Sequence, residues 1–406
     1  MKEFELFFIN NQAAAMSCFF IFAVVVGVLA TVVTKLAVAI KDKAKLPDGV
    51  VGGILIGAIT SIPEFITAIG VTVEGVLYPD AYDPASVFGD VIGSNMFCLL
   101  ILAVTLIITV KLFRHREADQ INTITIICLI FGAIMCILAV LFENNGIVYG
   151  GEGQPRSPLV WHGFNFFSIF IFLSYAIAVF FMFAGSKLKP MAIVGKGVAT
   201  KLSLPPQQKV KRSKFLKLSM SLLIVLLIIG VVVLSGTSLV LSSACSGCIE
   251  NWGLGPVFGR TLLLGVATSL PELIAVATLA FSGRYNMMIN SMAGSCAFNM
   301  IILSVCNAIY AGMWNSTTQP MFPQPQERNS VVVQVVLFIL MCLFTALYLI
   351  INSKHIKTRL TNKQIIIVNS VLLSLVIIAY FAYIALGIIQ WFTIEPKPDQ
   401  LLAFMI

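Results

Sequence analysis

The sequence has little charge, few histidines and no nucleotide-binding motif. Asp, Glu, Lys and Arg make up 11% of its 406 residues, whereas a soluble domain has about a quarter. The three histidines are scattered, and the nine cysteines do not show the spacing of a zinc site. No glycine-rich phosphate-binding loop is present. These absences argue against a soluble protein, a zinc protein and an ATP-driven pump.

Long apolar runs dominate instead. Hydrophobic residues make up 59% of the chain, and the mean hydropathy is +0.98. The runs approach or exceed the ~20 residues that cross a bilayer as a helix, and they lack the alternation of a membrane β-barrel. We therefore expect an all-α transmembrane protein of ten helices. The expected spans are 16–40, 49–71, 85–110, 121–142, 162–183, 215–241, 255–281, 286–311, 330–352 and 364–392.

The basic residues predict the orientation. If both termini lie outside, the loops on the cytoplasmic side hold twenty Lys and Arg residues and the outer side holds five. This bias follows the positive-inside rule. The net charge of +8 then reflects topology and contact with anionic membrane lipid, and it does not indicate nucleic acid. Without an organelle address, a multi-pass protein of the plasma (cytoplasmic) membrane is the default expectation.

A short polar motif occurs twice inside the apolar helices. Residues 56–66 read IGAITSIPEFI, and residues 264–274 read LGVATSLPELI. Each copy is followed by a Gly-Ser-x-x-Phe element, which begins at Gly93 in one half and at Gly294 in the other. The chain therefore divides into two repeats of five spans. We expect a first repeat over 1–190, a basic cytoplasmic linker over 191–214 and a second repeat over 215–406.

Five spans per repeat is an odd number, so the two repeats are expected to have inverted topology. Inverted repeats of this kind place ion sites near the membrane midplane, on broken helices where the repeats meet. Here the motifs fall in spans two and seven. We expect both of these helices to be broken.

Each motif carries an acid at membrane depth, Glu64 in the first copy and Glu272 in the second. An acid near the bilayer centre costs at least ~2.5–3.5 kcal/mol, so it indicates a functional site. Ca²⁺ prefers several oxygen ligands, carboxylates among them. Pro63 and Pro271 each distort the helical turn before the neighbouring glutamate, and the Thr-Ser pair of each motif adds hydroxyls. The set offered by the two motifs is Thr60, Ser61, Glu64, Thr268, Ser269 and Glu272.

Other readings stay open for some of these residues. Proline is tolerated as a kink in membrane helices, and Thr and Ser often bond back to their own helix. Asp90 is a third acid near a span, and a solvated helix start is its favoured interpretation. Ser94 and Ser295 are either close-packing residues or secondary ligands.

The paired Gly-x-x-Thr-Ser-x-Pro-Glu blocks, each followed by Gly-Ser-x-x-Phe, resemble the alpha repeats of the calcium/cation antiporter superfamily. The sodium/calcium exchanger branch is the most similar. The resemblance implies Ca²⁺ antiport against Na⁺ by alternating access, with spans one and six sliding past the motif helices. The ions are cargo, and neither an enzymatic activity nor a cofactor is implied.

The resemblance also implies roles for single residues. Thr60, Glu64, Thr268 and Glu272 correspond to the calcium ligands, and Ser61, Ser269, Ser94 and Ser295 to residues that hold sodium. The family pattern often has a polar side chain four residues after the serine of the Gly-Ser pair. Asn299 supplies it in the second repeat, whereas Cys98 stands there in the first.

Further departures from the family pattern leave the coupling ion open. Asp90 stands where Asn is usual, and Asn95 is matched by Cys296 in the other repeat. Proton-coupled exchange of Ca²⁺ or another divalent cation is the main alternative, with Glu64 and Glu272 titrating. A passive channel is a further alternative. A thiol oxidoreductase that uses Cys245 and Cys248 is the remote one.

Overall fold

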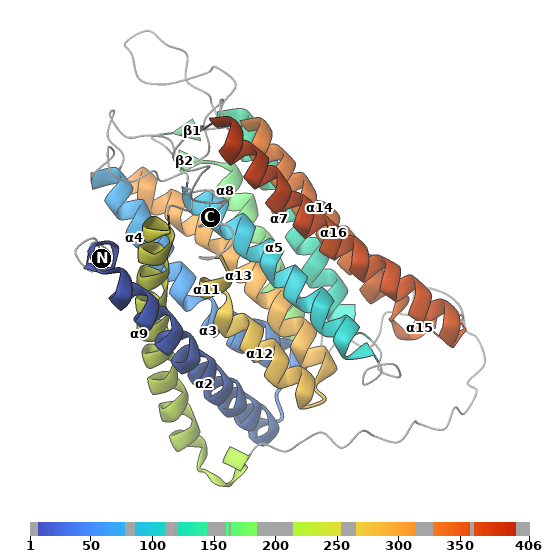
Figure 1. The fold of residues 1–406 in the computed structure, drawn as a ribbon. Helices are drawn as coiled ribbons and strands as arrows, with labels where there is room; N and C mark the ends of the chain where they lie inside the picture. The colour runs from blue at the N-terminus through green and yellow to red at the C-terminus, as the bar shows by residue number, and fades with distance from the viewer. Residues whose placement is uncertain are drawn as a thin grey trace, which may run out of the picture.

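The computed structural model describes residues 7–77, 86–110, 118, 120–143, 160–161, 164–184, 214–252, 265–313, 328–357 and 361–394. The expected linker 191–214 lies outside these residues except for Lys214, so the division into three segments stays a prediction. Within the described part the chain is almost entirely helical, as Figure 1 shows.

The helices follow the expected spans closely. They are α2 (Gln12–Ala44), the π-helix η1 (Val50–Ile56), α3 (Gly57–Thr60), α4 (Ile62–Leu77), α5 (Ser86–Ile108), α7 (Gln120–Glu143), α8 (Phe167–Ala184), the 3-10 helix η2 (Lys214–Lys217), α9 (Met220–Asn251), α11 (Gly265–Thr268), α12 (Leu270–Phe281), α13 (Tyr285–Gly312), α14 (Arg328–Ile351), α15 (Lys354–Lys357) and α16 (Asn362–Ile394). Two short strands, β1 (Val160–Trp161) and β2 (Phe164–Asn165), pair antiparallel before α8.

Eight of these helices are long and apolar enough to cross a membrane by themselves. A ninth span is the bent pair Val50–Thr60 and Ile62–Leu77, whose two parts meet at an angle of 44°. The tenth expected span, 255–281, is described from Gly265 as α11 and α12. The prediction of an all-α transmembrane protein is confirmed, and spans two and seven are the two broken ones.

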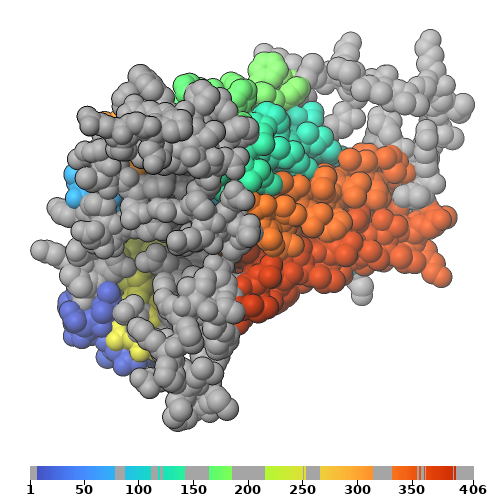
Figure 2. All heavy atoms as spheres, turned by 90° about the horizontal axis from the view of Figure 1, so that it is seen from above, coloured from blue at the N-terminus to red at the C-terminus, as the bar shows by residue number. Residues whose placement is uncertain are grey.

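The helices form two groups that meet at α13. The long helices α2 and α9 pack along each other on one side of the molecule (Figure 1). On the other flank α14 contacts both α7 and α16, and α7 contacts α8, which Figure 2 shows from above. Between them α13 contacts η1, α3, α4, α5, α8 and α12. The motif helices therefore surround α13 in the middle of the protein.

Contacts between the two halves come in exchanged pairs. In one pair α2 packs on α12, and its counterpart α9 packs on α4. In the other, α13 packs on η1 and α3, and its counterpart α5 packs on α11 and α12. Exchanged contacts of this type arise when two equivalent units pack around a twofold axis. Each half thus completes the surroundings of the other half's broken helix.

Glycine makes the closest of these contacts possible. A methyl group at Gly294 in α13 would lie 2.0 Å from the carbonyl oxygen of Gly53. A methyl group at Gly57 would lie 2.7 Å from the backbone nitrogen of Ser295. In the first half the corresponding Gly93 faces only the Tyr383 hydroxyl, at 3.0 Å from such a methyl group. Gly294 therefore allows α13 to pack closely on the backbone of the first motif helix, whereas Gly93 packs on a flexible side chain.

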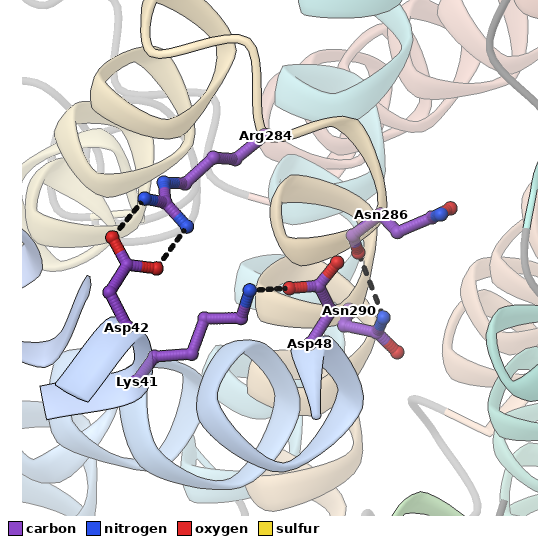
Figure 3. Close-up of polar contacts among 6 residues, drawn as sticks. All are labelled: Lys41, Asp42, Asp48, Arg284, Asn286 and Asn290. Atoms are coloured by element: carbon purple, nitrogen blue, oxygen red, sulfur yellow. Dashed lines mark hydrogen bonds and ion pairs between the residues drawn. The ribbon is translucent and has the colours of Figure 1, made fainter. Parts of the chain in front are cut away.

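Ion pairs tie the end of α2 to its neighbours (Figure 3). Arg284, directly before α13, donates to both carboxylate oxygens of Asp42 at 3.0 and 2.5 Å. Lys41 pairs with Asp48 at 2.6 Å across the turn that leads to η1. The Lys43 ammonium donates to the backbone carbonyl of Leu218. These contacts hold the α2–α9 pair against the central helices at the predicted cytoplasmic end.

The close approach of α13 to η1 at Gly294, which we call the glycine crossing, leads to a prediction for the stability of the folded protein. We expect Gly294→Ala to destabilise the folded protein by about 1–3 kcal/mol or more, because backbone atoms cannot move aside as a side chain can. Gly236→Ala in α9 is the matched control, since nothing lies within 4 Å of a methyl group there. Thermal unfolding of both variants in detergent measures the difference. Equal midpoints for the two variants would contradict the crossing.

Candidate cation site

Each motif breaks its helix at a serine. Ser61 separates α3 from α4 with φ −93° and ψ 4°, and Ser269 separates α11 from α12 with φ −89° and ψ 12°. Both conformations lie in the sparsely populated region between helix and extended chain. Pro63 and Pro271 follow two residues later, in the first turn of the next helix, where a missing N–H is tolerated. The two breaks are therefore equivalent in geometry as well as in sequence.

The first break faces residues of the second half. Ser61 Oγ donates to Glu272 Oε1 at 3.1 Å and lies 2.6 Å from Ser295 Oγ. Ser295 Oγ in turn lies 3.2 Å from the same Glu272 oxygen. One carboxylate oxygen is thus held by hydroxyls from both halves.

The second break repeats the contact between serines, but neither of its serines bonds the carboxylate of Glu64. Ser269 Oγ lies 3.1 Å from Ser94 Oγ, and Asn299 Nδ2 donates to Ser94 at 3.2 Å. Exchanging the halves converts the Ser61–Ser295 contact into the Ser269–Ser94 contact. Ser94 and Ser295 were open between packing and ligation, and both lie among the polar atoms of this centre.

Several buried polar atoms of the centre have no hydrogen-bond partner among the described residues. They are both oxygens of Glu64, Glu272 Oε2, both polar atoms of Asn95, and Asn299 Oδ1. Glu64 is 3% exposed and Glu272 2% exposed, and the two carboxylates interact electrostatically. A buried group left unpaired costs ~1–3 kcal/mol, and more when it is charged. A cation bound between these oxygens would remove that cost.

The two threonines of the motifs are also buried. Thr60 Oγ1 donates to the carbonyl oxygens of Ile56 and Gly57 in its own helix, both at 3.1 Å. It also lies beside the Glu272 carboxylate. Thr268 ends α11, directly before the break. The back-bonding alternative therefore describes Thr60 in part, and the hydroxyl oxygen remains beside the second glutamate.

Two residues of α5 belong to the centre although the motif did not select them. Asn95 is fully buried next to Ser94. Asp90 is half-buried one turn before Ser94, in the second turn of α5, and interacts electrostatically with Glu64; its solvation at the helix start stays a prediction. Its spacing of four residues from Ser94 on one helix face is the signal that could have found it.

Carboxylates alone do not make this site. Within the described ranges, no three His, Cys, Asp or Glu side chains form a metal-binding group. A cation here would take its remaining ligands from hydroxyl, amide and backbone oxygens. Such a ligand set suits Ca²⁺ and Na⁺ better than transition metals.

The comparison with protein families agrees with this geometry. The family described as sodium/calcium exchanger protein matches residues 14–183 and 222–391. The chain belongs to the sodium/calcium exchanger family. The two matched stretches are offset by 208 residues, which is also the offset between Glu64 and Glu272. The members of this family are transporters, so the polar centre lies in a multi-pass transport protein.

Solved exchangers share the fold. The sodium-calcium exchanger NCX_Mj, soaked with 10 mM Na⁺ and zero Ca²⁺, superposes with a TM-score of 0.53 at 15% identity, over 89% of this chain and 96% of that one. The H⁺/Ca²⁺ exchanger CAX superposes with a TM-score of 0.58 at 14% identity, over 99% of this chain and 94% of that one. No curated protein matches the sequence significantly.

The unpaired carboxylates lead to a prediction for the cation-free protein. In the cation-free protein we expect Glu64→Gln to raise the thermal unfolding midpoint, because it removes one of two neighbouring buried carboxylates whose oxygens are not fully paired. Glu74→Gln, near the other end of the same helix α4, is the matched control and should leave the midpoint unchanged. A lower midpoint for Glu64→Gln than for the control would show that the glutamate has a partner without a cation.

Proposed function

We propose that this chain is a secondary antiporter that exchanges Ca²⁺ for Na⁺ by alternating access, in the plasma membrane. One observation carries the proposal: Glu64 and Glu272, from equivalent breaks in the two halves, lie buried together with unpaired oxygens. Two carboxylates balance the charge of one divalent cation. The surrounding hydroxyls of Ser61 and Ser295 supply further oxygen ligands.

Sodium can replace calcium without separate machinery. Na⁺ accepts the same kind of oxygen ligands, and the Ser94–Ser269–Asn299 cluster lies at the second break. Several monovalent cations can neutralise the two carboxylates as one Ca²⁺ does. Occupancy by either ion removes the unpaired charge, which allows the loaded site to change its exposure from one side to the other.

Proton coupling is the second candidate, and one observation favours it. Neither oxygen of Glu64 has a hydrogen-bond partner among the described residues. A proton on this carboxyl group would neutralise it in a low-dielectric surrounding as effectively as a sodium ion. The thiol of Cys98 also replaces the polar side chain that Asn299 provides in the other half. In this version one proton on each glutamate replaces Ca²⁺.

One helix–helix interface lies beside each break, the α4–α13 seam beside the first and the α5–α12 seam beside the second. These two seams support alternating access because they are not equally closed. Phe65 and Phe298 are in edge contact at 6.0 Å between ring centroids, and Tyr175 contacts Phe298 at 6.1 Å. These rings close the α4–α13 seam. In the predicted orientation this seam runs from the site toward the outer face.

The equivalent α5–α12 seam runs toward the predicted cytoplasmic face, and it is hollow. Leu273 corresponds to Phe65, and Phe97 corresponds to Phe298. Phe97 contacts Tyr380 instead, at 6.0 Å, and an apolar groove of about 310 Å³ lies between α5 and α12, open on the side of the exposed Ile108 and Phe281. Exchange of these two arrangements between the halves would close the inner seam and open the outer one.

Transport measurements test the proposal directly. We expect Ca²⁺ uptake into proteoliposomes when a Na⁺ gradient is imposed and little uptake with a pH gradient alone. Glu64→Gln and Glu272→Gln should each abolish it, because one carboxylate cannot balance the divalent charge, and Glu74→Gln should transport normally. Uptake driven only by the pH gradient would instead support proton coupling. Uptake that tolerates both glutamate substitutions would reject the site, and saturation without counter-ion dependence would indicate a channel.

The seams generate a second functional prediction. Phe65→Leu removes an aromatic pair worth about 0.5–1.5 kcal/mol from the closed outer seam. Leu273→Phe fills the inner groove. Both changes should favour the outward-facing state and increase the apparent affinity for Ca²⁺ applied outside by about two- to tenfold.

Oriented proteoliposomes measure that affinity, and Phe170→Leu on the exposed surface of α8 is the control. Shifts of opposite sign for Phe65→Leu and Leu273→Phe would show that the seams do not alternate.

A further inference from the structure

A largely buried ion pair connects the two groups of helices at the predicted cytoplasmic end (Figure 3). The guanidinium of Arg284 donates two hydrogen bonds to the Asp42 carboxylate, from Nη1 to Oδ1 at 3.0 Å and from Nη2 to Oδ2 at 2.5 Å. The Arg284 side chain is 6% exposed and the Asp42 side chain 21% exposed. Asp42 lies in the last turn of α2, whereas Arg284 lies between α12 and α13. The ion pair therefore crosses the boundary between the α2–α9 pair and the central helices.

The backbone fixes the position of Arg284. At the end of α12, Gly283 has a positive φ of 73°, and its N–H donates to the Ala280 carbonyl oxygen at 3.0 Å. The N–H of Arg284 donates to the Leu279 carbonyl oxygen, also at 3.0 Å. These two bonds form the Schellman motif, which ends a helix at a glycine in the left-handed conformation. Because α13 begins at the next residue, Tyr285, the guanidinium is attached to the central helices on both sides.

A movement of α2 along α12 would break this ion pair. Further along α2, Gly27 faces the side chain of Ile274 in α12 across an apolar contact. Apolar contacts have no preferred direction, whereas a bidentate arginine–carboxylate pair requires one geometry. A displaced α2 could exchange one apolar neighbour for another, but Arg284 would lose its partner. Arg284 Nε already has no hydrogen-bond partner among the described residues, so the separated guanidinium would be costly to bury.

The repeat does not provide opposite charges at the equivalent positions. Asp42 corresponds to Glu250 by the offset between the motifs, and Arg284 corresponds to Asp83 by the offset between the Gly-Ser elements. Two ionised acids cannot form an ion pair with each other. The interaction between Asp42 and Arg284 therefore distinguishes the two halves, and it favours the position of the α2–α9 pair in which the outer seam is closed.

We propose that the Asp42–Arg284 pair is a conformational latch, which holds the α2–α9 pair against the central helices and opens when that pair moves. The inference rests on the proposed alternating access, because the latch restrains the movement on which that mechanism depends. It goes beyond the cation site, since neither residue lies among the candidate ligands. Weakening the latch should increase the population of the state in which the outer seam is open.

Distances between two spin labels test the latch in the cation-free, full-length protein. The labels are attached at Leu222→Cys, near the start of α9, and at Ile350→Cys, near the end of α14, because both side chains are exposed. The background carries Cys18→Ser and Cys128→Ser, since the other seven cysteines are buried. We expect one main distance in this background protein.

The decisive variant combines Asp42→Asn with Arg284→Gln, which removes the ion pair without leaving an unpaired charge. It should increase the population of a second distance by about tenfold. The exchanged variant, Asp42→Arg with Arg284→Asp, restores opposite charges and should reverse most of this increase. If the exchanged variant does not fold, Arg284→Lys, which keeps the charge and loses the second hydrogen bond, should give an intermediate population.

Asp48→Asn is the matched control, because it removes a carboxylate from the more exposed Lys41–Asp48 pair near the same end of α2. It should leave the distances unchanged. The latch is refuted if the neutral double variant keeps the distances of the background protein, or if Asp48→Asn changes them as strongly. No ion gradient enters this measurement, so its failure is distinguished from failure of the proposed function: unchanged distances in a protein that exchanges Ca²⁺ reject the latch alone.

Discussion

The structure is organised around two buried carboxylates that are only partly paired: among the described residues, neither oxygen of Glu64 and only one oxygen of Glu272 has a hydrogen-bond partner. Glu64 and Glu272 lie at the centre of a membrane-embedded helical bundle, where an ionised group without a partner is costly. The two helices break at Ser61 and Ser269, beside these acids, and each break is completed by hydroxyls of the opposite half. The glycines at the crossing bring those hydroxyls into range. A cation bound between the two carboxylates would pair their remaining oxygens and would connect the two halves.

A pair of residues marks where the halves are related. Asn95 and Cys296 are equivalent positions, and the Cys296 thiol contacts the backbone carbonyl of Asn95, so exchanging the halves returns the same pair of residues although not the same pair of atoms. The local twofold axis of the site therefore passes between α5 and α13. The α2–α9 pair lies to one side of this axis and reaches the centre through α12 and α4. This separation is compatible with the proposed alternating access, in which the α2–α9 pair would move against the helices that carry the candidate ligands.

Much of this fold could be predicted from periodicity and from the repeat, because membrane spans have length limits that are visible in the sequence. The span expected at 330–352 is α14 at Arg328–Ile351, and the two breaks occur within the motifs. The pairing of Ser61 with Ser295 and that of Ser94 with Ser269 could not be predicted in the same way. These contacts depend on how α5 and α13 cross the broken helices, and a linear repeat identifies equivalent positions without showing which of them touch.

The two halves are not fully equivalent at the polar centre, where the candidate cation ligands lie. At one break the Asn299 amide reaches the Ser94 hydroxyl, whereas at the other the Cys98 thiol takes that place beside Ser295. An amide oxygen is a good ligand for a hard cation and a protonated thiol is a poor one. On the proposed function, the two breaks would therefore bind Na⁺ with unequal strength, although their backbones are alike. The similar backbones would allow access to alternate between the two faces of the membrane, and the unequal side chains would favour one ion over another at each break.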